Sequence, residues 1–290
     1  MNDCVPERPL GRSGISVPAL GIGTNRWDCG ASDQARLQQS LAAAVDTGTG
    51  FFDTAEIYSQ GRSEIALGAA ARHDGRPVLL ASKFAPSARR VTAAQFAAAL
   101  DRTLERLGRD SLDLYYLHFP SALRGVGSWM RAMATAVKAG KIRAVGISNC
   151  DAAQMQQATD VLARYGIPLA ANQVHYSLLH RKPETDGVLD ACRRIDVALV
   201  AYRPIGKGLI GASSGQPGLT EVLQETAAAR SATAAQVALA WLLKRDNHVI
   251  PIPGATSPEH VRENSGALSL ELSEDEFAAI DRASAPAPAR

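Results

Sequence analysis

The sequence alternates short apolar runs with longer amphipathic stretches along almost its whole length, and this alternation limits the fold more than any other feature. Eight runs have the length and composition of buried strands, and a stretch of helical periodicity follows each one. Because a helix between two strands returns the chain to the same edge of a sheet, the alternation predicts a parallel sheet. The strand-like runs are Ala19–Gly23, Phe51–Asp53, Val78–Lys83, Leu112–His118, Ile142–Ser148, Ala170–Val174, Ala198–Tyr202 and Val249–Ile252. The helical patterns are Asp33–Thr47, Ser63–Arg72, Thr92–Leu107, Gly127–Ala139, Asp151–Tyr165, Pro183–Ile195, Ala234–Leu243 and Pro258–Ala267.

Eight parallel strands are the number that closes into a (β/α)8 TIM barrel of the α/β class, which typically needs about 250 residues. The chain has 290 residues, so it can hold one such barrel. A doubly wound open sheet would show the same alternation, so periodicity alone leaves that fold open. We expect one domain over residues 1–290, with an ordered core of about 8–283 and a flexible tail over 284–290.

Two segments lie outside the eightfold repeat. Arg8–Leu10 and Ile15–Val17 flank the turn segment Gly11–Gly14, a pattern typical of a β-hairpin. We expect this N-terminal hairpin to plug the bottom of the barrel. Ser273–Ala283 opens with a Ser-Glu-Asp-Glu capping box, which predicts an extra C-terminal helix.

Composition and charge argue against several classes of protein. The formal net charge is +2 without a block of one sign, so we expect neither a nucleic acid nor an anionic membrane surface as a partner. The N-terminal residues lack the apolar stretch of a signal peptide, and no run approaches the roughly 18 apolar residues of a membrane span. Cys4, Cys29, Cys150 and Cys192 show no CxxC spacing, which indicates reduced thiols. We expect a cytoplasmic protein, either a monomer or a small homo-oligomer.

In a barrel of this kind the catalytic groups project from the carboxyl ends of the strands. Seven of the predicted strands end at, or just before, residues that could form a site on one face. Any one of them could instead be a cap or a core residue, but the coincidence across strands favours a site. In chain order these residues are Asp53, Lys83, His118, Ser148 with Asn149, Gln173, Tyr202 and Pro253 with Gly254.

The motifs of several other reaction classes are missing. No serine stands in a GxSxG turn and no cysteine ends a strand, so acyl transfer lacks a nucleophile. Gly21-Ile22-Gly23 lacks the third glycine of a Rossmann fingerprint, and no GxxxxGK[ST] motif occurs. Asp53, His118 and His175 do not make a closed set of metal ligands, so we expect no metal.

The remaining residue types suit proton transfer. Tyr58 follows Asp53 by five residues, and a free tyrosine has a pKa near 10, which is too high for efficient donation at neutral pH. A nearby ammonium group would lower that pKa, and a carboxylate would hold the ammonium in place. Arginine outnumbers lysine 25 to 6, so a lysine beside a buried strand suggests chemistry. Asp53, Lys83 and Tyr58 therefore predict a tuned acid, with His118 able to hydrogen-bond a substrate oxygen.

These residues resemble the aldo-keto reductase family, and the resemblance runs from about Leu10 to Asp281. Each motif is short, but in this order and at these strand ends the motifs are very specific. The motifs of the first half are Gly50-Phe51-Phe52-Asp53-Thr54-Ala55-Glu56-Ile57-Tyr58, Arg62-Ser63-Glu64, Leu67-Gly68, Ser82-Lys83 and Asp113-Leu114-Tyr115-Tyr116-Leu117-His118. Those of the second half are Gly140-Lys141-Ile142-Arg143, Gly146-Ile147-Ser148-Asn149, Asn172-Gln173, Ala201-Tyr202, Pro204-Ile205-Gly206, Ile252-Pro253-Gly254 and Glu263-Asn264.

The resemblance implies reduction of an aldehyde or ketone to an alcohol with NADPH, bound in extended form on a barrel without a Rossmann fold. It implies that Asp53, Lys83 and His118 are catalytic together with Tyr58, the general acid. The nicotinamide end would contact Gly23, Thr24, Ser148, Asn149, Gln173 and Tyr202. The pyrophosphate and adenosine would contact Arg203, Pro204, Ile205, Gly206, Lys207, Gly208, Leu209, Pro253, Gly254, His260, Arg262 and Asn264.

The chain departs from the family pattern at several positions. Arg203 stands where a serine is frequent, so it could contact phosphate or point outward. His260 and Arg262 are the basic groups available for the 2′-phosphate, where many members have a lysine and an arginine; NADPH is expected, with NADH left open. The substrate itself is not identified by the sequence. Candidate contacts for a small carbonyl substrate, each of which could instead be loop packing, are Arg26, Trp27, Phe84, Phe119 and Trp129.

Two other functions remain open beside the active reductase. One is a regulatory subunit that keeps the barrel and cofactor without turnover, as the potassium-channel β subunits do. The other is a lyase or isomerase in which Lys83 forms a Schiff base, although Tyr58 and Asn149 would then be unexplained. The complete set of four predicted catalytic residues favours the reductase.

Overall fold

The computed structural model describes residues 5–28, 30, 33–121, 123–206 and 217–285, and all that follows concerns these residues. The strands are β1 (Glu7–Pro9), β2 (Ser16–Pro18), β3 (Ile22–Gly23), β4 (Phe51–Asp53), β5 (Leu79–Phe84), β6 (Leu112–Leu117), β7 (Ile142–Ser148), β8 (Leu169–His175), β9 (Ala198–Tyr202) and β10 (Val249–Ile252). The helices are α1 (Gln34–Asp46), η1 (Tyr58–Gly61), α2 (Arg62–Asp74), α3 (Ala93–Leu107), α4 (Val126–Lys138), α5 (Ala152–Ala163), α6 (Lys182–Thr185), α7 (Val188–Ile195), α8 (Pro217–Ala229), α9 (Ala234–Arg245), α10 (Pro258–Ser265), η3 (Gly266–Ser269) and α11 (Glu274–Ala283).

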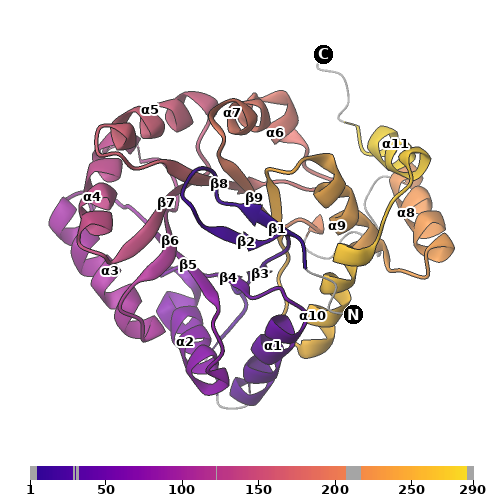
Figure 1. Cartoon of the computed structure of the whole chain (residues 1–290), viewed down its shortest axis with the longest axis horizontal. Helices are drawn as coiled ribbons and strands as arrows, with labels where there is room; N and C mark the ends of the chain where they lie inside the picture. The colour runs from indigo at the N-terminus through magenta and orange to yellow at the C-terminus, as the bar shows by residue number, and fades with distance from the viewer. Residues whose placement is uncertain (1–4, 29, 31–32, 122, 207–216, 286–290) are drawn as a thin grey trace.

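Strands β3 to β10 form one parallel sheet in chain order, with each strand hydrogen-bonded to the next. The first and last strands also meet, because the Gly21 amide donates to the Pro251 carbonyl (3.0 Å) and the Gly23 amide donates to the Pro253 carbonyl (2.9 Å). Figure 1 shows the strands as a ring with the helices outside it. The predicted barrel is confirmed, and the doubly wound open sheet is excluded.

The seam between β3 and β10 requires residues without side chains. A Cβ atom on Gly21 would lie 2.7 Å from Cδ1 of Phe51, and one on Gly23 would lie 3.0 Å from the Ile252 carbonyl oxygen. Proline has no N–H to donate, so the bonds involving Pro251 and Pro253 run from the glycine amides to the proline carbonyls. Close approach of the two backbones therefore closes the barrel.

Strands β1 and β2 form the predicted antiparallel hairpin, which lies across one end of the barrel (Figure 1). Leu10, Ile15 and Val17 are buried in the same apolar cluster as the residues that fill the barrel interior. A Cβ atom on Gly11 would lie 2.6 Å from the carbonyl oxygen of Asp196, which precedes β9. The hairpin therefore covers the amino ends of the strands and leaves their carboxyl ends to the site.

The stretch predicted as one helix, Pro183–Ile195, forms two, α6 and α7, and three other parts of the chain differ from the predicted elements. Strand β3 has two residues rather than five, and helix α8 was not predicted. A Gly/Ser-rich stretch precedes Pro217-Gly218, which usually marks a turn, although proline also suits the first turn of a helix. Ser284, where we expected a flexible tail to begin, is buried and accepts a hydrogen bond from Arg181 (3.1 Å), so the core extends further. Residues 286–290 of that tail lie outside the described residues.

Helix α11 is the predicted extra C-terminal helix, and its Ser273 capping box is present. Arg181 binds Glu184 through two hydrogen bonds of 2.7 Å and reaches Asp281 of α11 at 2.8 Å. Its guanidinium lies 4.9 Å from the ring centre of Trp241 on α9. This partly buried cluster attaches α11 to the barrel. No helix in the described ranges is both long and apolar enough to cross a membrane.

Replacing Glu184 by glutamine is expected to destabilise the protein near neutral pH and to make its stability less sensitive to acid. Burial would raise the pKa of Glu184, but hydrogen bonds from Arg181 and Tyr176 lower it below its usual value. The pKa of Glu184 is therefore lower in the folded protein than in the unfolded chain, where it is about 4.5. The stabilisation is fully present above the unfolded-state pKa and is lost as the pH falls through the folded-state pKa. We expect the free energy of unfolding to fall by about 1–3 kcal/mol at pH 7.

Urea unfolding at pH 7 and at pH 4 and below measures this effect, and the two proteins should converge at the lower pH values. Glu274, whose side chain is 87% exposed and pairs with Lys244, supplies the control Glu274→Gln, which should behave like the parent. An equal loss from both substitutions would contradict the role of the cluster.

Candidate functional site

A buried ion pair lies at the carboxyl ends of β4 and β5. The Lys83 ammonium donates to Oδ1 of Asp53 and to the carbonyl oxygen of Thr54 (2.7 Å), and Gln173 Nε2 donates to the other Asp53 oxygen (2.7 Å). Burial alone would lower the pKa of Lys83, but the Asp53 carboxylate and the Tyr58 phenol raise it above its ordinary value. Lys83 is therefore a fixed positive charge, held away from water.

Tyr58 lies directly above this pair, in the short loop after β4. Lys83 Nζ lies over the face of the Tyr58 ring, 5.0 Å from the ring centre. The loop reverses sharply, because Ser59 and Gln60 adopt left-handed conformations with φ of 47° and 58°. The turn leaves the Tyr58 side chain partly exposed at the barrel mouth.

His118 follows β6 and completes the group of four that the sequence predicted. Its ring meets the Tyr58 ring edge-on, with centres 5.8 Å apart. Burial, with the nearby charge of Lys83, lowers the pKa of His118 to about 3, so the imidazole is neutral near pH 7. Its buried Nδ1 atom has no hydrogen-bond partner among the described residues. A neutral imidazole can donate one hydrogen bond to a substrate oxygen without adding charge.

A second set of polar side chains comes from β7, β8 and β9. Ser148 Oγ donates to the Gln173 carbonyl (2.8 Å), and Asn149 Nδ2 donates to the His118 carbonyl (3.0 Å). The Tyr202 hydroxyl donates to Asn149 Oδ1 (3.0 Å). These bonds fix the Asn149 amide group and the Tyr202 ring, which stacks on His175 at 5.3 Å between centres.

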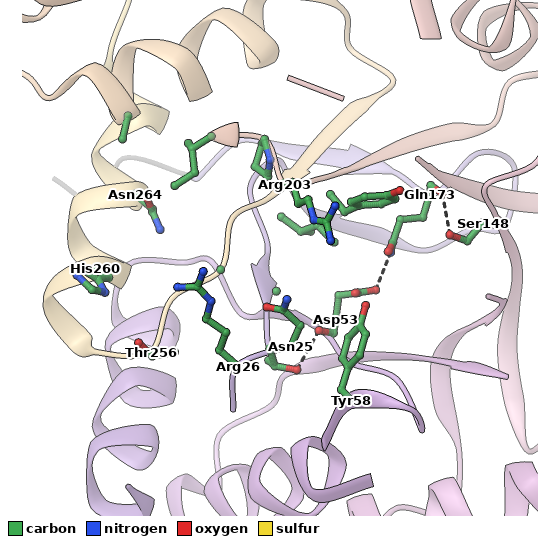
Figure 2. A pocket seen from close by; sticks show the side chains of 18 of the residues that line it. Asn25, Arg26, Asp53, Tyr58, Ser148, Gln173, Arg203, Thr256, His260 and Asn264 are labelled. Atoms are coloured by element: carbon green, nitrogen blue, oxygen red, sulfur yellow. Dashed lines mark hydrogen bonds between the residues drawn. The ribbon is translucent and has the colours of Figure 1, made fainter. Parts of the chain in front are cut away.

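A cavity of about 1050 Å³ connects both sets of residues. It is at the upper end of the size range of ligand pockets, so it can hold a ligand as large as a dinucleotide. The predicted site residues that line it are Gly23, Thr24, Arg26, Asp53, Tyr58, His118, Phe119, Ser148, Asn149, Gln173, Tyr202, Arg203, Pro204, Ile205, Gly254, His260 and Asn264. Figure 2 shows Tyr58, Asp53, Gln173 and Ser148 at one end, His260, Thr256 and Asn264 at the other, and Arg26 and Arg203 between them.

The structure corrects three predicted substrate contacts. Trp27, Phe84 and Trp129 are fully buried and do not line the cavity. Trp27 donates its indole N–H to the Ala255 carbonyl (2.6 Å). Phe84 and Trp129 pack against each other behind the barrel wall, with ring centres 4.9 Å apart. All three are packing residues, and Arg26 and Phe119 are the candidates that remain.

The structure also narrows the predicted cofactor contacts. Arg262 is exposed and does not line the cavity, because on α10 it is two residues from His260 and so lies on another face. Pro253 and Gly206 are buried and do not line the cavity. Lys207, Gly208 and Leu209 lie outside the described residues.

Five residues that line the cavity were not predicted as site residues. A helical signal was available for one, since Glu263 is three residues after His260 and therefore shares its face of α10. Asn25 directly follows Thr24 in the loop after β3, and Ile252 ends β10. The five are Asn25, Ala235, Ile252, Thr256 and Glu263.

Comparisons with known proteins show which family the chain belongs to. The sequence profile described as "Aldo/keto reductase family" matches residues 19–285. The chain is 31% identical to "Aldo-keto reductase yakc [NADP(+)]" of Schizosaccharomyces pombe, over 93% of this chain and 88% of the relative. It is 35% identical to "Methylglyoxal reductase YeaE" of Escherichia coli, over 94% and 93%.

Comparison with solved structures also finds aldo/keto reductases. A crystal structure of an aldo/keto reductase from Klebsiella pneumoniae in complex with NADP and acetate superposes with a TM-score of 0.87. The two chains are 34% identical, and the match covers 99% of this chain and 98% of the other. With a profile match over most of the chain and relatives above 30% identity along nearly its full length, this protein belongs to the aldo/keto reductase family of oxidoreductases.

Proposed function

We propose that the protein reduces an aldehyde or ketone to the corresponding alcohol, with NADPH as the reductant and Tyr58 as the proton donor. The observation that carries this proposal is the position of Lys83, a buried ammonium that pairs with Asp53 and lies 5.0 Å from the ring centre of Tyr58. Asp53 and Tyr58 both line one end of the large cavity. Among the side chains there, Tyr58 has a proton to give and a positive charge beside it to stabilise the phenolate left behind.

Each of the four residues has one task in this proposal. Tyr58 gives its phenolic proton to the carbonyl oxygen, and Lys83 stabilises the charge that remains. Asp53 keeps Lys83 charged and in place. His118, which is neutral, donates a hydrogen bond to the same carbonyl oxygen and so orients the substrate. When bound, the reduced nicotinamide supplies the hydride that the carbonyl carbon takes up.

The residues around the cavity fit an extended dinucleotide. Near Tyr58, the amides and hydroxyl of Asn149, Gln173 and Ser148 would hold the carboxamide group, and Tyr202 offers a ring for stacking. The opposite end, with His260, would take the adenosine. The comparisons support NADP(H) as the cofactor, since a relative and two structural neighbours carry it in their names and titles.

The proposal is tested by measuring NADPH oxidation by the purified protein against a panel of aldehydes, ketones and sugars. Methylglyoxal and pyridoxal belong in the panel because two relatives are named as reductases of these compounds. We expect carbonyl-dependent oxidation with at least one class. Tight NADPH binding without turnover on any of the panel would favour the regulatory alternative.

NADPH is expected to bind more tightly than NADH, with a margin that depends on His260. The 2′-phosphate distinguishes the two cofactors and belongs to the adenosine end, where His260 lines the cavity and Arg262 does not. His260→Arg should therefore strengthen NADPH binding by about one to two decades, the value of one charged hydrogen bond, and leave NADH unchanged. Fluorescence titration of both cofactors measures this. Arg262→Gln is the matched control and should change neither affinity; tighter NADH binding by the parent would overturn the preference.

We propose a cytoplasmic location and a monomer or small homo-oligomer. Cys150 and Cys192 are free and buried, as expected in a reducing compartment. Size-exclusion chromatography tests the oligomeric state, and fractionation of the cells that make the protein tests the location.

A further inference from the structure

Two loops above the barrel each contain a short turn that begins with a serine and ends with an arginine. In the loop after β5, Ser87 pairs with Arg90, and in the loop after β6, Ser121 pairs with Arg124. Both turns lie at the end of the barrel that carries the site, because they follow the strands that lead to Lys83 and His118. Neither arginine lines the cavity.

Arg90 connects its loop to the loop that carries Tyr58. Its two terminal nitrogens donate to the two oxygens of Glu56, at 2.8 and 2.9 Å. Glu56 also accepts the backbone N–H of Ala85 (2.7 Å), so one carboxylate joins two loops. The Arg90 guanidinium lies 4.7 Å from the ring centre of Phe84, and the Glu56 side chain is only 8% exposed. A bidentate pair in a sheltered place fixes geometry better than an exposed pair does.

Arg124 makes the equivalent connection one loop further on. It donates to the carbonyl oxygen of Val91, the residue after Arg90, and its guanidinium lies 4.9 Å from the ring centre of Trp129. The Phe84 and Trp129 rings are in contact, so the two guanidinium groups pack on neighbouring aromatic rings. The contacts therefore run in series from the His118 loop, through the loop after β5, to the Tyr58 loop.

Tyr58 comes two residues after Glu56, just before the left-handed turn at Ser59 and Gln60, so a short stretch of chain links it to this connection. We propose that Glu56 and Arg90 are positioning residues, which hold the Tyr58 phenol at its distance from Lys83; this inference rests on the proposed role of Tyr58 as the acid. A displacement of about 1 Å at a reacting group can cost a factor of about 100 in rate.

The test is Arg90→Met, measured with NADPH and a carbonyl that the parent reduces. We expect kcat to fall by about 10- to 100-fold. The affinity for NADPH, measured by fluorescence, should stay within about twofold, because neither member of the pair lines the cavity. Arg90→Lys keeps the charge but loses the two-pronged geometry, so its kcat should lie between the two. Glu56→Gln, which keeps an acceptor for Ala85, should resemble Arg90→Met.

The readout that separates positioning from general damage is the same substitution in a Tyr58→Phe background. If Arg90 acts through the phenol, Arg90→Met should cost nothing further there, since the group it positions is gone. The control is Arg230→Met, because Arg230 also makes a two-pronged pair, with Glu276, but away from the cavity. It should keep the kcat of the parent.

Four outcomes would overturn the inference: parental kcat in Arg90→Met and Glu56→Gln, an equal loss in the Tyr58→Phe background, an equal loss in Arg230→Met, or a large loss of NADPH affinity. If Arg90→Met does not fold, Arg90→Lys and Glu56→Gln carry the same comparison. A Tyr58→Phe protein as fast as the parent would instead contradict the proposed function.

Discussion

Tyr58→Phe is expected to lower kcat by about 10²–10⁴, the usual size of a general-acid contribution, while NADPH still binds. The substitution removes only the hydroxyl, so the ring keeps its contacts with His118 and Lys83. Steady-state kinetics and a fluorescence titration on the same preparation measure both quantities.

Tyr165 provides a matched control for this result. Its ring also faces a lysine, with Lys138 Nζ 5.2 Å from the ring centre, but it does not line the cavity. Tyr165→Phe should therefore keep the parental kcat. Undiminished reduction by Tyr58→Phe would show that Tyr58 is not the acid. A Schiff-base enzyme would give another pattern, in which borohydride traps the substrate on Lys83 and Tyr58→Phe is tolerated.

Lys83→Met is expected to cost at least as much activity as the loss of Tyr58, and to destabilise the fold as well. Without the ammonium group, the phenolate charge is not stabilised and Asp53 is left buried without its partner. Removing one member of a buried pair typically costs about 3–5 kcal/mol, so the free energy of unfolding should fall by a similar amount. Guanidinium unfolding and kcat together test this prediction.

The double variant Asp53→Asn, Lys83→Met separates the two effects. A neutral amide in place of the carboxylate removes the buried charge and keeps a partner for Gln173, so stability should recover in part while activity does not. Lowering the pH should also help the single variant, because burial favours the protonated carboxyl group once Lys83 is gone. Lys141→Met, which breaks the exposed pair with Asp101, should change neither property; a similar loss there would contradict the argument from burial.

Most of the fold could be predicted from the sequence, because hydrophobic periodicity indicates where strands and helices alternate. The eight strands, the hairpin and helix α11 follow from spacing and turn residues alone. Helix α8 was missed because a Gly/Ser-rich stretch and Pro217-Gly218 give a local signal for a loop, and its packing against α9 and α11 overrides that signal. Closure could not be read from the sequence, since no local pattern records that β3 meets β10.

For the site, reactive residues were easier to predict than their surroundings. Side chains alternate along a strand, so Lys83 inside the barrel places its neighbour Phe84 outside, a rule that could have removed Phe84 from the substrate contacts. The same reasoning on a helix separates His260 from Arg262. The Glu56–Arg90 pair had no sequence signal, because 34 residues separate partners that meet only after the loops have folded.

At the seam between β3 and β10, the glycine amides of β3 and its preceding residue donate to proline carbonyls at the other end of the chain, and this has a consequence for how the protein is made. The chain leaves the ribosome from its N-terminus, so the amides of Gly21 and Gly23 emerge long before the carbonyls of Pro251 and Pro253. The interval is similar for Arg8, because its hydrogen-bond acceptor, the Asp246 carbonyl, lies 238 residues further along the chain. At roughly 5–20 residues per second, this interval lasts roughly 12–50 seconds. During that time β3, the first strand of the barrel, has an unpaired edge. Only β10, in the last part of the chain to be synthesised, can pair with that edge.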